Sequence, residues 1–225
     1  MTTILARRFA STAELDSALI ERLEHAISGP DAGGTAVMLS GGRTPLPAYR
    51  ELAARKPRAA SGLTVLYCDD RYVPATSESS NYYQSRTLIE TLALPESSVL
   101  RVRTELPFES AAADYETRIR RLLQSGVRIG LGLLGLGADG HTASLFNSAH
   151  LEQARGHLAI AVQRPDGLQG ISVTPEVLSQ VAEPLFLVTG ADKHAITEEF
   201  LKRDSSLIAR RAVAACPKAE IWIAA

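Results

Sequence analysis

Four short apolar runs, each of the length of one buried strand, recur along the chain and constrain its fold. They span residues 35–39, 63–68, 129–134 and 184–188. Helical patterns separate them, and this alternation is typical of a mostly parallel sheet with helices on both faces. We therefore predict an α/β fold of this kind. We treat residues 1–225 as a single domain, because α/β folds of this length are often one unit.

The other elements follow from periodicity and from start and stop signals. Ser11 and Glu14 predict a capped helix start, and Gly29 followed by Pro30 predicts its end. Further helices are predicted after Pro45, over 82–92, over 108–123 and from Lys193 to about Lys202, and further strands over 99–102, 157–162, 171–173 and 220–224.

Each of the four apolar runs is followed at once by residues that suit a ligand site. These segments are residues 40–45, 69–74, 135–146 and 189–193. In open parallel sheets, ligands bind beyond the carboxyl ends of the strands. Four such segments at equivalent positions are stronger evidence for one site than any of them alone.

The segment after the third run contains the residues best suited to proton transfer. His141 lies two positions after Asp139, and a histidine at such a strand end is well placed to act as a general base. Asp139 has three possible roles: it orients the imidazole, it caps a helix, or it contacts a sugar. Thr142 and Ser144 offer hydroxyls near the start of a predicted short helix.

The segment after the first run suits an anion. Gly41 and Gly42 expose backbone N–H groups, and the helix start that follows favours negative charge. Arg43 and Thr44 add a charge and a hydroxyl. The segment is not a Walker A loop, because the Gly-Lys-Ser/Thr ending is absent. A plain tight turn is an equally weighted alternative when the segment is taken alone.

Two further charged groups lie at strand ends. Asp69, Asp70 and Arg71 follow the second run, either as part of the site or as a solvated loop or structural ion pair. Lys193 lies in the first turn of a predicted helix, where a lysine is electrostatically unfavourable for the helix itself. A bound phosphate would explain that lysine, and a simple exposed lysine is the alternative.

Composition limits the classes of binding partner and the cellular compartment that we expect for this protein. A net charge of −1 argues against nucleic acid or an anionic membrane as the main partner. No run is long enough to span a bilayer. Cys68 and Cys216 lack any Cys-x-x-Cys spacing, so we expect reduced, buried thiols in a cytoplasmic protein and no thiolate zinc site. The Gly-x-Ser-x-Gly elbow of serine hydrolases is also absent.

The successive motifs resemble those of the 6-phosphogluconolactonase family. They are Ser-Gly-Gly-Arg-Thr-Pro at 40–45, Asp-Asp-Arg-Tyr-Val-Pro at 69–74, Ser-Asn at 80–81, Leu-Gly-Leu-Gly-Ala-Asp-Gly-His-Thr-Ala-Ser-Leu-Phe at 134–146, and later Gly190 and Lys193. The resemblance implies a fold shared with glucosamine-6-phosphate deaminases and, more distantly, ribose-5-phosphate isomerases. It also implies hydrolysis of 6-phospho-D-glucono-1,5-lactone to 6-phosphogluconate, in the oxidative pentose phosphate pathway, without a metal.

The same resemblance implies roles for individual residues. His141 corresponds to the catalytic base, and Arg71 and Lys193 to residues that contact substrate or phosphate. The predicted catalytic residues are His141, Arg71 and Asp139, and the predicted substrate or phosphate contacts are Ser40, Gly41, Gly42, Arg43, Thr44, Asp69, Asn81, Gly140 and Lys193. We expect no cofactor and no metal. The sugar-phosphate lactone is the expected partner, and the expected assembly is a monomer or weak homodimer.

The chain departs from the family pattern at four positions, one of which is the segment after Trp222, where the aspartate that often follows this tryptophan is absent. Asp70 stands where the family usually has glutamate, and Asn147 where it usually has proline. Gly170 stands where an arginine is common. Whether Arg164 replaces that arginine is left open by the sequence.

Two other functions remain as alternatives. An amino-sugar phosphate deaminase or isomerase on the same fold would resemble the family in which Ile-Ala-Phe-Asn-Glu-Pro follows the histidine. Here Thr-Ala-Ser-Leu-Phe-Asn follows His141, without that glutamate. The second alternative is a sugar-phosphate sensor that binds without turnover. Retention of His141 with both acids argues against it, as does the lack of an appended DNA-binding segment.

Overall fold

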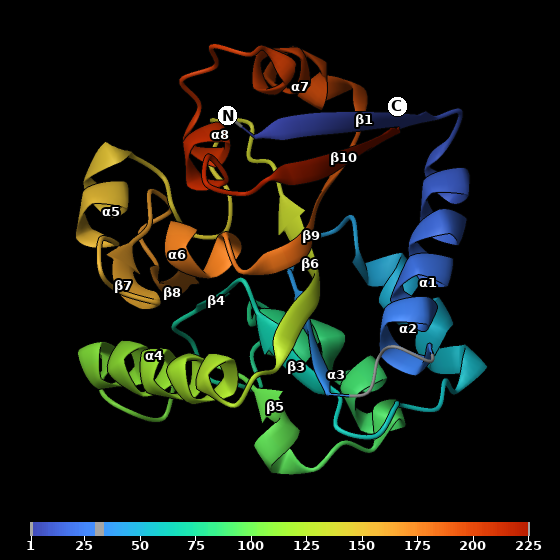
Figure 1. Cartoon of the computed structure of the whole chain (residues 1–225), viewed down its shortest axis with the longest axis vertical. Coiled ribbons are helices and arrows are strands. Elements are labelled where there is room, and N and C mark those ends of the chain that lie inside the picture. Colours follow the sequence, from blue (N-terminus) through green and yellow to red (C-terminus); the bar gives the residue numbers. More distant parts are fainter. Residues whose placement is uncertain (1, 30–33, 225) are drawn as a thin grey trace.

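The computed structural model describes residues 2–29 and 34–224, and within them seven parallel strands form one twisted sheet (Figure 1). In sheet order these strands are β1 (Thr3–Phe9), β10 (Lys218–Ala224), β9 (Val181–Thr189), β6 (Arg128–Gly135), β2 (Thr35–Leu39), β3 (Thr64–Tyr67) and β5 (Val99–Leu100). The predicted mostly parallel sheet is therefore confirmed.

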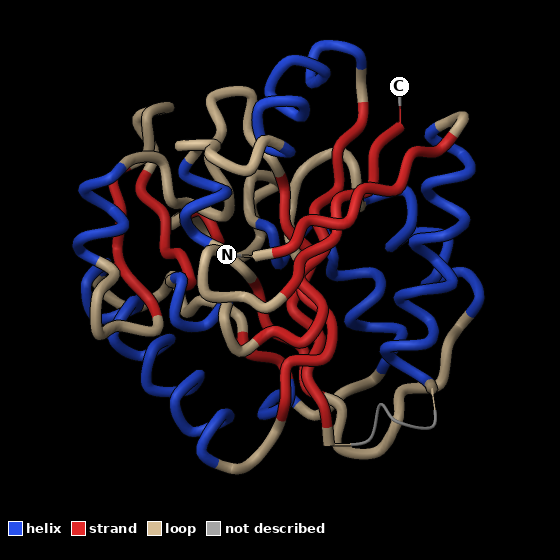
Figure 2. The backbone as a smooth tube through the Cα atoms, turned by 45° about the horizontal axis from the view of Figure 1, so that its top comes forward, coloured by secondary structure: helices blue, strands red, loops and turns tan. Residues whose placement is uncertain are grey.

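Alternate residues of each central strand enter two separate cores, one on each face of the sheet. In β2, Val37 and Leu39 pack on one face, and Ala36 and Met38 pack on the other. Figure 2 shows the sheet as a band between two layers of helices. The first face is covered by α1 (Thr12–Ser28), α2 (Leu46–Arg55) and α3 (Asn81–Leu92).

The second face is covered by the remaining helices and by a small second sheet. The helices are α4 (Phe108–Gln124), α5 (Ser148–Gln153), α6 (Pro175–Leu178), α7 (His194–Leu201) and α8 (Ile208–Ala212). Two short 3₁₀ helices, η1 (Glu96–Ser98) and η2 (Ala191–Lys193), have no buried residues. The second sheet is antiparallel, in the order β4 (Asp69–Arg71), β8 (Gln169–Val173) and β7 (Ala159–Gln163).

Several local predictions are confirmed and others are wrong. Ser11 caps α1 by accepting from the Glu14 N–H at 3.2 Å, and Gly29 is the C-cap. Pro30, the other half of that stop signal, lies outside the described residues. The predicted helix start near Thr142 is wrong, because residues 142–145 form a tight turn. The next helix is α5, whose N-cap is Asn147.

The sequence did not predict several elements, and for three of them, β1, β4 and α8, the physical reason is clear. β1 is an edge strand with a mostly exposed pattern, so it lacks an apolar run. β4 consists of three charged residues, a composition typical of a loop, although it pairs with β8. α8 spans only five residues.

The strand order brings the predicted motifs together. The neighbours β9, β6, β2 and β3 point their carboxyl ends to the same edge of the sheet. The connections lead one way from β2 to β3 and the other way from β6 to β9. The chain order therefore reverses between β2 and β6, and such a switch point is where ligands bind in open α/β sheets.

Candidate active site

Two adjoining cavities open at this edge of the sheet. The larger, of about 550 Å³, includes Arg43, Thr44, Thr189 and Lys193 in its wall. The smaller, of about 170 Å³, includes Asp69, Arg71, Asn81, His141 and Arg164. Both are lined by Ser40, Gly41, Gly42, Gly135 and Leu136, so they form two parts of one cleft.

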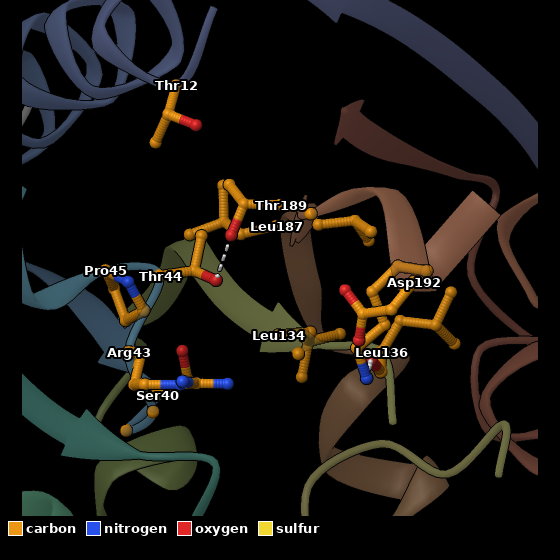
Figure 3. A pocket seen from close by; sticks show the side chains of 16 residues that line it. Thr12, Ser40, Arg43, Thr44, Pro45, Leu134, Leu136, Leu187, Thr189 and Asp192 are labelled. Atoms are coloured by element: carbon orange, nitrogen blue, oxygen red, sulfur yellow. Dashed lines mark hydrogen bonds between the residues drawn. The ribbon is translucent and has the colours of Figure 1, made fainter. Parts of the chain in front are cut away.

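The larger cavity lies between the loop after β2 and the end of β9. Thr44 and Thr189 reach toward each other across it, with their hydroxyl oxygens 3.0 Å apart (Figure 3). Arg43 is exposed and lines the same wall. Gly42 has a φ of +94°, a conformation that favours glycine, and its N–H donates to Gln84 Oε1 at 3.1 Å. That N–H is therefore occupied rather than free for an anion.

Lys193 reaches the larger cavity from the other side. It lies in η2 and caps α7, rather than in the first turn of an α-helix as predicted. Its ammonium donates to the Leu136 carbonyl at 3.3 Å, which directs it toward the end of β6. Asp192, which sequence reasoning missed, also lines this cavity. The larger cavity thus contains two cations and one carboxylate.

Asp69 and Arg71 enter the smaller cavity together because alternate residues of a strand share one face. Asn81, the first residue of α3, connects them. It accepts a hydrogen bond from Arg71 at its carboxamide oxygen and donates to Asp69 Oδ1 at 3.0 Å. Gly41 packs against the same carboxamide so closely that a Cβ there would overlap it.

Asp70 points away from the cavity and holds α3 in place. It is 1% exposed and accepts hydrogen bonds from Asn81 N at 2.6 Å, Tyr82 N at 3.2 Å and Ser80 Oγ at 3.0 Å. Burial raises its pKa to about 6, although these bonds favour the ionised form. Its contacts are structural, because Asp70 lines neither cavity.

His141 and Asp139 form a hydrogen-bonded pair. His141 Nδ1 lies 2.5 Å from Asp139 Oδ1, and the same oxygen accepts the His141 backbone N–H at 3.2 Å. Burial opposes ionisation of Asp139, but these bonds outweigh it and lower the pKa of that carboxyl. Because a carboxylate only accepts, Nδ1 carries the hydrogen that points to Asp139, which leaves Nε2 as the nitrogen that faces away from this pair.

Two neighbours fix the imidazole ring in its position. Gly137 lies against it, and a Cβ at that residue would overlap His141 Nδ1. Phe146 packs on the ring with a centroid separation of 4.3 Å. His141 is therefore held at the wall of the smaller cavity, and its Nε2 forms no hydrogen bond with the described residues.

The helix-cap alternative for Asp139 is wrong, since no helix begins there. Gly140 lines neither cavity. It has a φ of +81°, packs against Leu207, and accepts the Ala209 N–H at its carbonyl at 2.8 Å. Its place in the structure is that of a turn residue that anchors α8, which argues for a structural rather than a substrate-binding role.

The smaller cavity also contains side chains that the sequence did not assign. The Arg164 guanidinium donates to Ser144 Oγ at 2.7 Å, and Ser144 donates to Asp69 Oδ2 at 2.5 Å. Cys68 donates to Asp69 Oδ1 at 3.3 Å, and burial raises the pKa of its thiol. Cys68 and Cys216 are both free and buried, as predicted.

Two further observations concern the part of the chain that the structure describes. Among the described residues, no three His, Cys, Asp or Glu side chains gather where they could hold a metal ion. No helix in that part of the chain combines the length and apolar character needed to cross a membrane.

Comparison with known proteins decides the family. The model for glucosamine-6-phosphate isomerases/6-phosphogluconolactonase matches residues 7–222. The chain belongs to this family. Among the relatives, human 6-phosphogluconolactonase is 35% identical over 207 residues, which cover 86% of this chain and 80% of the human protein. The 6-phosphogluconolactonase of Thermotoga maritima is 34% identical over 170 residues, 74% of each chain.

Solved structures of the family share the fold. The crystal structure of Thermotoga maritima 6-phosphogluconolactonase has a TM-score of 0.77 at 26% identity, covering 99% of this chain and 100% of that one. A monomeric glucosamine-6-phosphate deaminase has a TM-score of 0.75 at 15% identity, covering 98% of this chain and 97% of that one. The second likeness confirms the predicted fold relationship to the deaminases and concerns the fold alone.

Proposed function

We propose that this protein hydrolyses 6-phospho-D-glucono-1,5-lactone to 6-phospho-D-gluconate in the oxidative pentose phosphate pathway. One observation supports this above all: an imidazole paired to a carboxylate lines a cavity that adjoins a second, cationic cavity. His141 and Asp139 provide the first feature, and Arg43 and Lys193 provide the second. The human and Thermotoga maritima relatives, at 35% and 34% identity, are both 6-phosphogluconolactonases and support the same substrate.

The two cavities divide the substrate between them. The phosphate lies in the larger cavity, where Arg43 and Lys193 neutralise its charge and Thr44 donates a hydroxyl hydrogen bond. The lactone ring extends into the smaller cavity, with C1 near His141. Ser40, Gly41 and Gly42 lie where the two parts meet and contact the middle of the substrate.

In the proposed hydrolysis, His141 acts as the general base. Neutral Nε2 removes a proton from water as the water oxygen forms a bond to the lactone C1 carbon. Asp139 stabilises the imidazolium that results, because its oxygen already accepts from Nδ1. The tetrahedral intermediate then expels the ring oxygen, which takes the proton from His141 Nε2. The product acid ionises in water.

Arg71 lies in the same cavity and supplies positive charge near the reacting carbonyl. Asn81 accepts a hydrogen bond from its guanidinium, and Asp69 lines the same cavity. We propose that the reaction needs no metal and no cofactor, since a base and cations are already in place. The proposed setting is the cytoplasm, with the sugar-phosphate lactone as the partner.

The test separates this function from the alternatives on the same fold. The purified protein is assayed for loss of 6-phospho-D-glucono-1,5-lactone above its spontaneous rate, and for ammonia release from glucosamine 6-phosphate. We expect accelerated lactone loss and no ammonia. Ammonia release would favour the deaminase. Tight binding of 6-phosphogluconate without lactone turnover would favour the sensor.

A further inference from the structure

Arg164 brings a charge into the smaller cavity that the mechanism above does not use. It follows β7 directly, and its backbone N–H donates to the Leu168 carbonyl at 2.9 Å across the β7–β8 turn. Its side chain is 8% exposed and lines the cavity beside His141. A guanidinium is costly to remove from water unless it is paired. The groups that pair with the Arg164 guanidinium therefore indicate its role.

Those partners leave part of the guanidinium unused. Nε and Nη2 donate to Asp166, at 3.2 and 3.0 Å, and Nη1 donates to Ser144 Oγ at 2.7 Å. Nη1 lies 3.7 Å from Asp69 Oδ2, because the Ser144 hydroxyl lies between the two groups and donates to that oxygen. Asp69 and Arg164 are thus bridged by a hydroxyl rather than joined as a bidentate ion pair.

A guanidinium has five N–H donors. Three are used by Asp166 and Ser144, which leaves one hydrogen on Nη1 and one on Nη2 without a partner among the described residues. Phe146 helps to fix this arrangement, since the Arg164 Cζ lies 5.1 Å from its ring centroid. The same ring packs on His141, so the imidazole and the guanidinium are held by one aromatic side chain.

Gly170 makes the route of this side chain possible. A Cβ built on Gly170 would lie 3.1 Å from Arg164 Cδ and 3.3 Å from Ser144 Oγ. Both distances are tighter than ordinary carbon contacts. Because Gly170 has no side chain, it leaves room for the Arg164 side chain on its way to the cavity.

We propose that Arg164 contacts the lactone end of the substrate and stabilises the negative charge that develops on its carbonyl oxygen. This role rests on the proposed lactonase activity. Arg164 lines the cavity that contains His141 and not the larger cavity of Arg43 and Lys193, so its ligand is the reacting carbonyl and not the phosphate. Gly170 is the positioning residue for this contact.

The first test compares three variants in the lactone assay. R164Q keeps a hydrogen-bonding side chain without the charge, R164A removes the side chain, and R155A removes an exposed arginine paired to Glu152 at 2.9 Å. We expect kcat to fall on the order of 100-fold in R164Q and R164A. KM and inhibition by inorganic phosphate should change less than about threefold, and R155A should match the wild type.

Two further measurements distinguish a direct contact between Arg164 and the substrate from a purely structural role of Arg164. Added guanidinium chloride at millimolar concentration should restore part of the R164A rate, and sodium chloride at equal ionic strength should not. G170A should lower kcat in the wild-type background and have little further effect in R164A, because both changes remove the same contact. Circular dichroism and thermal unfolding confirm that each variant is folded.

Different failures point to different conclusions. An inactive wild type would overturn the proposed function and this role with it. An active wild type with R164Q kcat within about twofold would overturn the role of Arg164 alone. The role would also be overturned if phosphate inhibition weakened in step with the loss of rate, or if R164Q, R164A and G170A all failed to fold, which would mark Arg164 as a structural ion pair.

Discussion

Gly41 lies so close to Asn81 that any side chain at residue 41 would overlap the Asn81 carboxamide. Asn81 accepts from Arg71 and donates to Asp69, so this contact joins the 40–45 loop to the charged face of β4. The two cavities meet at this point. The relative position of the two cavities depends on Gly41. The sequence indicates this glycine for a different reason, namely that its backbone N–H could bind an anion.

We expect G41A to disturb both cavities, because the new Cβ displaces Asn81 and with it Arg71. kcat/KM should fall at least about tenfold, and the free energy of unfolding should fall by about 1–3 kcal/mol, as in other overpacked sites. The matched control is G130A in β6, where the nearest atom to a new Cβ is the Ala36 carbonyl oxygen at 3.9 Å. Equal activity in G41A and G130A would contradict this interpretation.

Replacing Asp139 tests whether catalysis needs the carboxylate that pairs with His141. In D139N the amide no longer offers a negative charge to the imidazolium, and His141 Nδ1 loses its acceptor if the amide turns its NH₂ toward the ring. We expect kcat to fall about 10- to 100-fold. Asp139 is 54% exposed, so the free energy of unfolding should change by less than about 1 kcal/mol. A large loss of stability with full kcat would argue for a purely structural carboxylate.

Lys193 tests where the phosphate binds. K193A removes a cation from the larger cavity without touching His141, so KM for the phosphorylated lactone should rise about tenfold or more. Inhibition by inorganic phosphate should weaken by a similar factor. K202A is the control, because Lys202 is 60% exposed and paired to Glu199. Unchanged phosphate inhibition in K193A would place the phosphate elsewhere.

Asp70 makes the stability of the fold depend on pH. Its folded pKa of about 6 lies above its ordinary value of 3.8, so between these values the folded protein holds a proton that the unfolded chain has released. Its contribution to stability therefore falls as pH rises through this window, by up to about 3 kcal/mol. Urea unfolding from pH 4 to pH 7 should show a flatter dependence in D70N than in the wild type. Parallel curves would show that Asp70 does not titrate there.

Much of the site could be predicted because it lies in short segments after apolar strands. β2 and β6 are continuous apolar runs with glycines at their carboxyl ends, so the chain itself indicates both the strand and the loop that follows. His141, Lys193 and the 40–45 loop were placed in this way. The structure brings each of them to the wall of one cleft.

The parts that escaped prediction depend on contacts between distant segments. β4 is a strand only because Asp69, Asp70 and Arg71 pair with β8, about a hundred positions away in the chain. Arg164 enters the smaller cavity along a path close to Gly170, on the neighbouring strand, where a Cβ would lie 3.1 Å from its Cδ. Neither fact is visible in local periodicity, which records burial along one segment and not the shape of its partner.

The most direct test of the account compares the wild type with H141N in a coupled assay of 6-phospho-D-glucono-1,5-lactone loss. Asparagine cannot take a proton from water at neutral pH, so the base is removed while the cavity remains. We predict that the wild type exceeds the spontaneous rate and that a folded H141N loses at least about 100-fold of the enzymatic rate. An undiminished rate in H141N would contradict the assignment of His141 as the base.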